Sequence, residues 1–448
     1  MNRRGFLKSG LVSVGGLAAG GTLFAASDAR GARPSVAGSA DVIVAGGGPA
    51  GISAAVSFAR RGKRVILLET HGCLGGIWTS GLLSLVIDFG RSQLANEITR
   101  RLEALGARFP RRAVLNDANY LYEPEYMKFV CEELCREAGV RFQLHTSVVA
   151  VETDGRNVVA VETESKSGRQ RWTAPLFVDA TGDGDLAARA SCGFERGGDV
   201  PGDSDQPASL MALAVAEDGD GLAPFVVNDS RQFGDDGRSV ANAKLAFLQE
   251  LRRVGVDPSY SAPSLFRVRR GLFALMANHE YGVPVDDAAA ITAATIRARR
   301  ELITMARALE TKGGSVWRGF RIVATAEQLG HRGARRIHGR YTLTRKDVLE
   351  GRRFDDAIAA CGFCIDIHTT RREDRRDGVV VTDRGTDADF VQPVYQIPLR
   401  ACRAKDLDNL YMVGRCISGD FGAQASYRIT GAAVAMGEGL ARMLTERK

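Results

Sequence analysis

Several classes of protein are disfavoured by what the sequence lacks. Its eight cysteines include no four-cysteine cluster of ferredoxin spacing, so we expect neither an iron–sulfur cluster nor another metal site. Its net charge of +7 is small for 448 residues and gathers in no basic stripe, so we expect no nucleic-acid partner. No internal repeat is present. The remaining composition, 45% apolar and 25% charged, is that of a globular protein of about two or three domains.

The cysteine spacing also favours few disulfides. Cys131 and Cys135 lie one turn apart on an expected helix, where the geometry is poor for a disulfide, and we expect them to be buried. If residues 361–368 form a strand, Cys361 and Cys364 point to opposite faces. A structural role is therefore favoured over a redox or zinc pair.

The first residues resemble a twin-arginine export signal. Arg3 and Arg4 precede a Gly- and Ala-rich stretch over residues 11–26. That stretch is shorter than the roughly 20 residues that a membrane-spanning helix needs, which favours a cleaved signal over a retained anchor. We expect residues 1–38 to comprise the signal and a flexible mature N-terminus. The protein would then be periplasmic or secreted, after export by the twin-arginine machinery.

A dinucleotide-binding pattern follows directly. Residues 41–45 read as a β-branched strand, a glycine-rich turn follows, and residues 52–61 read as a helix. A second expected strand, residues 64–68, ends at Glu69, placed to accept hydrogen bonds from a ribose. Such a turn brings a pyrophosphate to a helix N-terminus. The residues expected to form this site are Gly46, Gly48, Pro49, Ala50 and Gly51.

Three further segments resemble cofactor loops of flavoproteins and favour FAD over NAD, because an extended flavin needs contacts along its whole length. The first is a paired-glycine loop, the second follows a strand at residues 175–179, and the third joins a strand near residue 412 to a helix expected over residues 429–442. That helix would aim its positive end at the flavin ring. The expected contacts are Gly75 and Gly76, then Thr181, Gly182 and Asp183, then Gly414, Asp420 and Gly431. Cys73 and Cys416 fall in two of these loops, which leaves a redox disulfide or a covalent flavin link open.

These motifs together resemble the FAD-dependent oxidoreductases related to the flavin subunit of heterodisulfide reductase, from residue 41 to the C-terminus. Further matching stretches are residues 122–125, 148–174, 334–344, 365–368 and 395–400. The resemblance implies a two-domain flavoprotein of Rossmann-like FAD/NAD(P)-binding fold, in the α/β class, with FAD as cofactor and Val148 among its contacts. The chain departs from the family pattern at residues 331–334, where it has His-Arg-Gly-Ala.

The expected domain order follows from these segments. Residues 39–194 would form the first part of the FAD-binding domain, with an insertion at 82–123, and residues 319–448 its second part. Residues 195–318 lack the glycine pattern and would form a substrate-side cap, with a long helix over residues 286–309.

The catalytic candidates are few, because a flavin itself accepts hydride and the protein supplies positioning and a proton acceptor. His338 could act as a base beside Arg336, an arginine that could bind an anionic substrate. His368, two residues after Asp366, is the second candidate base, and Arg428 precedes the flavin-facing helix. A purely structural role for each histidine remains an equal alternative.

The sequence therefore predicts an exported FAD-dependent dehydrogenase or oxidase of a small organic substrate. Its electrons would pass to a quinone, a cytochrome or oxygen. Two alternatives stay open, namely a reductase fed by a membrane electron carrier and a flavoprotein with isomerase or lyase chemistry.

Overall fold

The computed structural model describes residues 36–110, 118–198, 203–227, 239–375, 377 and 392–446. The predicted export signal lies outside these residues, and of the segment 1–38 only the last three residues are among them. Those three belong to strand β1 (Val36–Ser39), which pairs in parallel with β10 (Gly168–Thr173). The prediction of a flexible N-terminus through residue 38 is therefore wrong for residues 36–38, because their backbone is held in a sheet.

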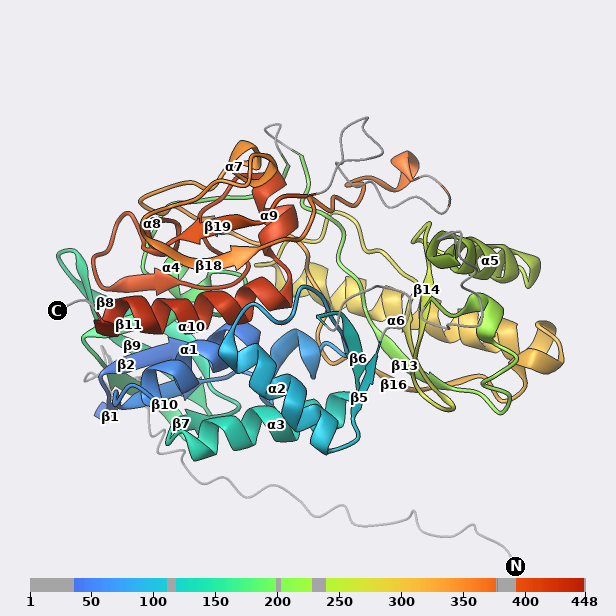
Figure 1. Cartoon of the computed structure of the whole chain (residues 1–448), viewed down its shortest axis with the longest axis horizontal. Coiled ribbons are helices and arrows are strands. Elements are labelled where there is room, and N and C mark those ends of the chain that lie inside the picture. The colour runs from blue at the N-terminus through green and yellow to red at the C-terminus, as the bar shows by residue number, and fades with distance from the viewer. Residues whose placement is uncertain are drawn as a thin grey trace, which may run out of the picture. The chain divides into compact units, whose positions relative to one another are not determined.

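A five-stranded parallel sheet forms the centre of the α/β part (Figure 1). Its order is β20 (Leu410–Met412), β11 (Leu176–Asp179), β2 (Val42–Ala45), β3 (Val65–Leu68) and β7 (Arg141–Gln143). The inner strands β2 and β3 are buried throughout, as expected of a parallel sheet with both faces covered. The Rossmann-like fold expected from the sequence is present.

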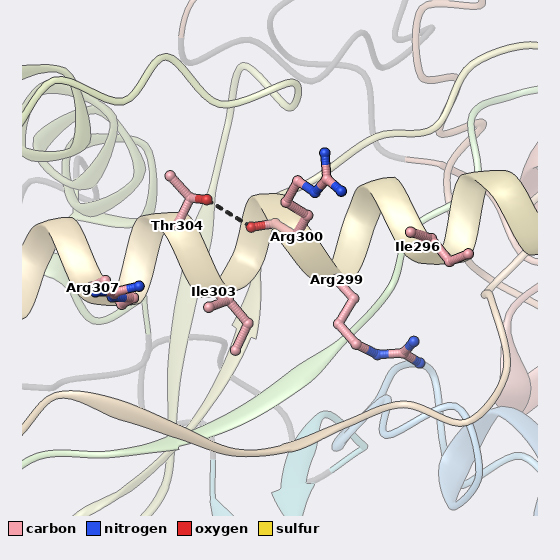
Figure 2. Close-up of a pocket in the computed structure, with 6 residues that line it drawn as sticks. All are labelled: Ile296, Arg299, Arg300, Ile303, Thr304 and Arg307. Carbon is pink, nitrogen blue, oxygen red and sulfur yellow. Dashed lines mark hydrogen bonds between the residues drawn. The ribbon is translucent and has the colours of Figure 1, made fainter.

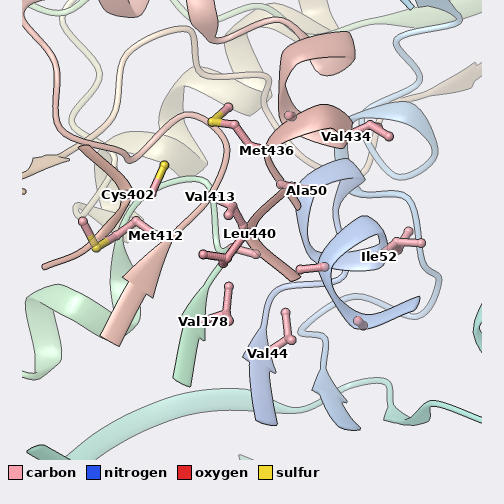
Figure 3. Close-up of a cluster of buried hydrophobic side chains, with 14 of the residues drawn as sticks. Val44, Ala50, Ile52, Val178, Cys402, Met412, Val413, Val434, Met436 and Leu440 are labelled. Carbon is pink, nitrogen blue, oxygen red and sulfur yellow. The ribbon is translucent and has the colours of Figure 1, made fainter. Parts of the chain in front are cut away.

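Two helices pack on each other beside this sheet, α1 (Pro49–Ala59) and α10 (Thr430–Glu446). Figure 3 shows side chains of both helices in one cluster with Val44 of β2 and Val178 of β11. A meander of β8 (Ser147–Asp154), β9 (Asn157–Ser165) and β10 completes a second sheet with β1. The first and last thirds of the chain thus share one core.

A separate core lies in the middle of the chain. Its antiparallel sheet has the order β14 (Ser264–Arg269), β15 (Leu272–Met276), β13 (Ala212–Val215) and β16 (Arg321–Thr325). Helices α5 (Ser239–Arg253) and α6 (Ala288–Lys312) pack with it, and α6 is capped by Asp287. A boundary at residue 318 would separate β16 from its sheet, so the segment extends through that strand.

The expected insertion at 82–123 joins both cores. It holds α2 (Gln93–Ala104) and a small sheet of β4 (Leu85–Val86), β6 (Tyr120–Tyr122) and β5 (Arg108–Pro110), and α3 (Pro124–Glu137) follows it. Leu85 and Leu121 lie in the middle core, whereas Phe89 and Tyr120 lie in the core of the parallel sheet.

Short elements complete the described part of the chain. They are α4 (Asp185–Arg189), β12 (Phe194–Glu195), β17 (Arg336–Ile337), α7 (Arg345–Leu349), β18 (Ala357–Cys361), β19 (Tyr395–Pro398), α8 (Leu399–Cys402), α9 (Phe421–Tyr427) and the 3-10 turns η1 (Gly76–Trp78), η2 (Ala223–Phe225), η4 (Ser315–Trp317) and η5 (Arg372–Asp374). Among the described helices, none is long and apolar enough to span a bilayer.

The strand considered for residues 361–368 is wrong beyond its first residue. Strand β18 ends at Cys361, opposite Tyr395 of β19. The next amide, that of Gly362, donates to Asp88 Oδ2 at 2.8 Å instead of continuing the ladder. All eight cysteines lie among the described residues and none forms a disulfide, and Cys131 and Cys135 are fully buried.

Candidate active site

The glycine turn between β2 and α1 is shaped for close approach of a ligand. Gly46 has φ +99°, and a Cβ there would lie 2.5 Å from the carbonyl oxygen of Ala180. A Cβ on Gly51 would lie 1.8 Å from the carbonyl oxygen of Gly46. Gly48, by contrast, has nothing within 4 Å of its Cβ position. The side toward a ligand is therefore open while the side toward the protein is packed.

Helix α1 begins at Pro49 with its first amides uncapped. Its N-cap is Gly48, which offers no side-chain acceptor, and the first intrahelical bond is from Ile52 N to Gly48 O at 2.9 Å. The N-terminal amides of Ala50 and Gly51 therefore carry the positive end of an 11-residue helix. Such a terminus is suited to a pyrophosphate.

The paired-glycine loop lies against this turn. Gly75 N donates to Gly47 O at 2.8 Å, and a Cβ on Gly76 would come within 2.9 Å of Gly48 Cα. Both predicted glycines thus lie where only a backbone without side chains fits. The two loops form one continuous glycine cradle.

Glu69 is buried and holds the cradle in place. Its Oε2 accepts from Gly47 N at 2.5 Å and its Oε1 accepts from His71 N at 2.7 Å. Its carbonyl oxygen accepts from Thr146 N at 2.8 Å, which brings the start of β8, with Val148, alongside. That Glu69 also accepts hydrogen bonds from ribose hydroxyls stays a prediction.

The loops after β11 and β20 are joined by an ion pair. Arg415 binds the carboxylate of Asp183 and donates from Nε to Gly182 O at 3.2 Å. Thr181 Oγ1 donates to Asp179 Oδ1 at 2.7 Å, and Gly414 approaches Ala50 of α1, with its Cβ position 3.2 Å from Ala50 Cβ. These predicted cofactor contacts therefore border the same edge of the parallel sheet as the cradle.

Two predicted cofactor residues are engaged within the protein. Asp420 caps α9 by accepting from Ala423 N at 2.7 Å, and its other oxygen accepts from Arg345 N at 2.7 Å. A Cβ on Gly431 would lie 2.3 Å from the carbonyl oxygen of Asp88. The structure gives both a structural task, and their contact with a flavin stays a prediction.

A buried polar cluster lies at one end of the antiparallel sheet, where the middle of the chain meets residues 366–368 and Arg428. It draws on three extended segments that continue β13, β15 and β16 past the same end of their sheet, as the bridges Ala208↔Glu280 and Ser209↔Gly330 show. They are met by Tyr260, which lies between α5 and β14, by residues 366–368 and by Arg428 at the end of α9. Its members are Gln206, Tyr260, His279, Tyr281, His331, Arg332, Asp366, His368 and Arg428.

Aromatic rings define the centre of this polar cluster. The rings of Tyr260 and His279 lie 4.0 Å apart at 30°, and the ring of His368 stands edge-on to His279 at 5.1 Å and 83°. Asp366 Oδ2 lies 3.5 Å from His368 Nε2 and 3.1 Å from Arg428 Nη2. A histidine and a carboxylate thus meet an arginine, with little access to solvent.

Burial keeps the histidines of the polar cluster neutral. Burial, and secondly the charge of Arg332, lower the pKa of His368 to about 3 although Asp366 acts to raise it. Burial and Arg415 lower the pKa of His331 to about 4, and burial lowers that of His279 well below its ordinary value. The hydrogen bond from His368 and nearby arginines outweigh burial and hold the pKa of Asp366 below its ordinary value.

Several buried polar atoms in this region have no hydrogen-bond partner among the described residues. They are Gln206 Nε2, His279 Nε2, His331 Nε2, Gln424 Oε1 and Arg428 Nε. Buried polar atoms are ordinarily satisfied, and each unpaired one carries a free-energy cost. Their concentration here, beside the loops that carry Asp183 and Arg415, points to ligands that bind in this place.

The four predicted catalytic residues are divided by the structure. His368 and Arg428 belong to the polar cluster. His338 does not reach it: its side chain is 41% exposed and lies 3.2 Å from Glu195 Oε1. Arg336 is buried elsewhere, and its Nη1 donates to Gly197 O at 3.0 Å.

Sequence reasoning missed most of the polar cluster. Gln206, Tyr260 and His279 lie in the segment without a readable motif, and Arg332 lies in the stretch that departs from the family pattern. The stretch at residues 331–334, where the sequence was expected to depart from the family that it resembles, was the available signal.

A hollow lies on the exposed face of α6 (Figure 2). It is lined by Ile296, Arg299, Arg300, Ile303, Thr304 and Arg307. Figure 2 shows these side chains spread along the helix, and Ile296 is 52% exposed. It offers no buried base or acid, so we place the chemistry at the polar cluster.

Comparison with known proteins identifies the scaffold. A family model described as FAD dependent oxidoreductase matches residues 41–444. No curated protein sequence matches the chain. Similar solved structures include a geranylgeranyl bacteriochlorophyll reductase-like protein from Thermoplasma acidophilum, at 13% identity and TM-score 0.46, covering 91% of this chain and 78% of that one. Another is L-proline dehydrogenase from P. horikoshii, at 11% identity and TM-score 0.41, covering 91% and 94%.

Proposed function

Because the chain belongs to the family of FAD-dependent oxidoreductases, we propose that it is an exported dehydrogenase or oxidase of a small organic substrate. The observation that carries the proposal is a glycine cradle suited to FAD that lies near a buried cluster of neutral histidines and charged arginines. We also propose that the closer relatives are the proteins related to the flavin subunit of heterodisulfide reductase, on the stretches quoted above.

The residues present fit FAD. The uncapped amides of Ala50 and Gly51 would hold its pyrophosphate, and the backbone of Gly75 and Gly76 would lie beside it. When bound, FAD supplies the two-electron acceptor that takes a hydride from the substrate.

The chain itself supplies proton transfer and exclusion of water. Oxidation of an alcohol or amine carbon releases a hydride and a proton. His368 is neutral at pH 7 and stands beside Asp366, which stabilises the imidazolium once the proton arrives. The surrounding rings of Tyr260 and His279 keep bulk water away from this proton.

The cellular setting is part of the same proposal. The Arg3-Arg4 motif supports export by the twin-arginine route in a folded, cofactor-loaded form. NAD is scarce outside the cytoplasm, so the two electrons would pass to a quinone, a cytochrome or oxygen.

Anaerobic spectroscopy of the purified protein tests this function. We expect yellow protein that bleaches when a small organic donor is added and recovers colour with a quinone or oxygen. His368→Ala should slow bleaching by about 100-fold or more without loss of bound flavin, because general-base catalysis contributes that much. Protein that is reduced only by a quinol would reverse the proposed direction of electron flow, and colourless protein containing NAD would contradict the proposal.

A further inference from the structure

The polar cluster carries an uncompensated positive charge. Arg332 is positive at pH 7, because burial lowers its pKa only to about 10, and Arg428 forms an ion pair with Asp366. Asp366 is the one carboxylate that directly pairs with Arg428 there, and the cluster histidines are neutral at pH 7. A buried charge without a counterion is costly. The cluster is thus one negative charge short.

Arg332 is the residue that lacks this charge. Its Nη1 donates to Pro207 O at 2.6 Å and to Ser209 Oγ at 2.8 Å, both uncharged acceptors. Among the described residues, no carboxylate lies within ion-pair distance of its guanidinium. These two hydrogen bonds orient the guanidinium, whose planar fork is suited to an oxyanion.

The side-chain amide of Gln206 is a neutral donor close to Arg332, which bonds the next residue, Pro207. Gln206 precedes Pro207, and its Oε1 accepts from His368 N at 2.9 Å. Its Nε2 is buried and has no partner among the described residues, and the same holds for His279 Nε2. Both nitrogens can therefore bond a polar group of a ligand.

We propose that the substrate is a small organic anion, and that Arg332 binds its carboxylate together with the amide of Gln206. This inference rests on the proposed function and names the substrate class of the same site. The anion supplies the missing charge and satisfies the buried amide, so binding and charge balance occur in one step.

The bound anion also acts on the proton acceptor. The charge of Arg332 is the main cause, after burial, that lowers the pKa of His368. A carboxylate against Arg332 offsets that charge and raises the affinity of His368 for the proton released by the substrate. A neutral analogue would leave His368 a weaker base, so discrimination by charge extends to the chemical step.

Binding to the FAD-loaded protein tests the substrate class without turnover. Acetate, pyruvate, succinate and benzoate are each titrated against the corresponding amide, with calorimetry and the visible spectrum of the flavin as readouts. We expect at least one carboxylate to bind about tenfold or more tightly than its amide. Absence of binding by all four carboxylates, or equal binding of acids and amides, would overturn the proposal.

Variants then assign the charge to Arg332. Arg332→Met should weaken binding of the best carboxylate by about tenfold or more and leave its amide unaffected, while Arg332→Lys retains part of the affinity. The matched control is Arg300→Met on the exposed face of α6, which changes net charge equally and should leave binding unchanged. Undiminished carboxylate binding by a flavin-loaded Arg332→Met protein would refute the assignment.

Failure of this inference is distinguishable from failure of the proposed function. Protein that holds FAD and is bleached by uncharged donors keeps the oxidoreductase function and overturns only the anionic substrate. If Arg332→Met does not fold, the comparison of acids with amides on the wild-type protein still decides the substrate class.

Discussion

Gly437 of α10 lies so close to Ala50 of α1 that a Cβ on Gly437 would stand 2.5 Å from the carbonyl oxygen of Ala50. The same atom would stand 2.6 Å from Ala54 N. Ser53 Oγ, one turn along α1, donates to Val434 O at 2.6 Å. The backbones of α1 and α10 are therefore in direct contact, and the first turn of α1 is part of the glycine cradle.

Gly437→Ala should separate these helices, because both nearest groups are backbone atoms that cannot turn aside. We expect a loss of about 1–3 kcal/mol in the free energy of unfolding, measured in urea, and weaker FAD retention. The control is Gly90→Ala, whose nearest neighbour would be Ala118 Cβ at 3.7 Å. A Gly437→Ala protein as stable as the control would contradict the close packing.

Glu69→Gln should reduce the fraction of protein purified with FAD. The carboxylate accepts from two amides, Gly47 N and His71 N, and a glutamine offers only one oxygen to accept either. Flavin content is measured from visible absorbance relative to protein. Glu69→Ala should lower it further, and undiminished flavin in both variants would refute the role of Glu69 in shaping the cradle.

Substitution of the two leader arginines tests export. Replacing Arg3 and Arg4 with lysine keeps the charge and removes the twin-arginine pattern. We expect precursor to accumulate in the cytoplasm and mature protein to vanish from the periplasm, followed by immunoblotting of cell fractions. Unchanged periplasmic protein would mean that the leader is read by another route.

The cofactor side of the molecule was predictable because its signals are local. The strand at residues 42–45, the glycine turn and Glu69 lie within about 30 residues of one another, and each has a backbone reason for its identity. The parallel sheet follows from these β-branched, fully buried strands.

The substrate side was not predictable in the same way. Gln206, His279 and Arg332 are far apart in sequence and meet only because β13, β15 and β16 continue past one end of an antiparallel sheet. No spacing rule joins residues that tertiary structure brings together. His338 was a candidate because arginines precede it in sequence. In the structure its carbonyl oxygen accepts from Lys405 N at 2.9 Å, and its side chain lies beside Glu195, away from the polar cluster.

The buried histidines predict loss of stability at mildly acidic pH. The pKa of His368 is lowered to about 3 and that of His331 to about 4, while the unfolded chain binds protons at its histidines near pH 6.5. Below about pH 6.5 the unfolded state therefore takes up protons that the folded state refuses, so the free energy of unfolding falls as pH falls. Each such histidine contributes a slope of about 1.4 kcal/mol per pH unit.

Urea unfolding at several pH values between 7.5 and 4.5 measures this slope. His279→Phe keeps an aromatic ring against Tyr260 but removes one titrating group, so its stability should fall less steeply on the acid side. Tyr281→Phe, which alters the same neighbourhood and retains every histidine, should keep the wild-type slope. Equal slopes for all three proteins would show that His279 is protonated, or exposed to water, in the folded state. If His279 is exposed to water, solvent satisfies its Nε2, and this atom is not held for a substrate. If His279 is protonated, the polar cluster carries one more positive charge beside Arg332.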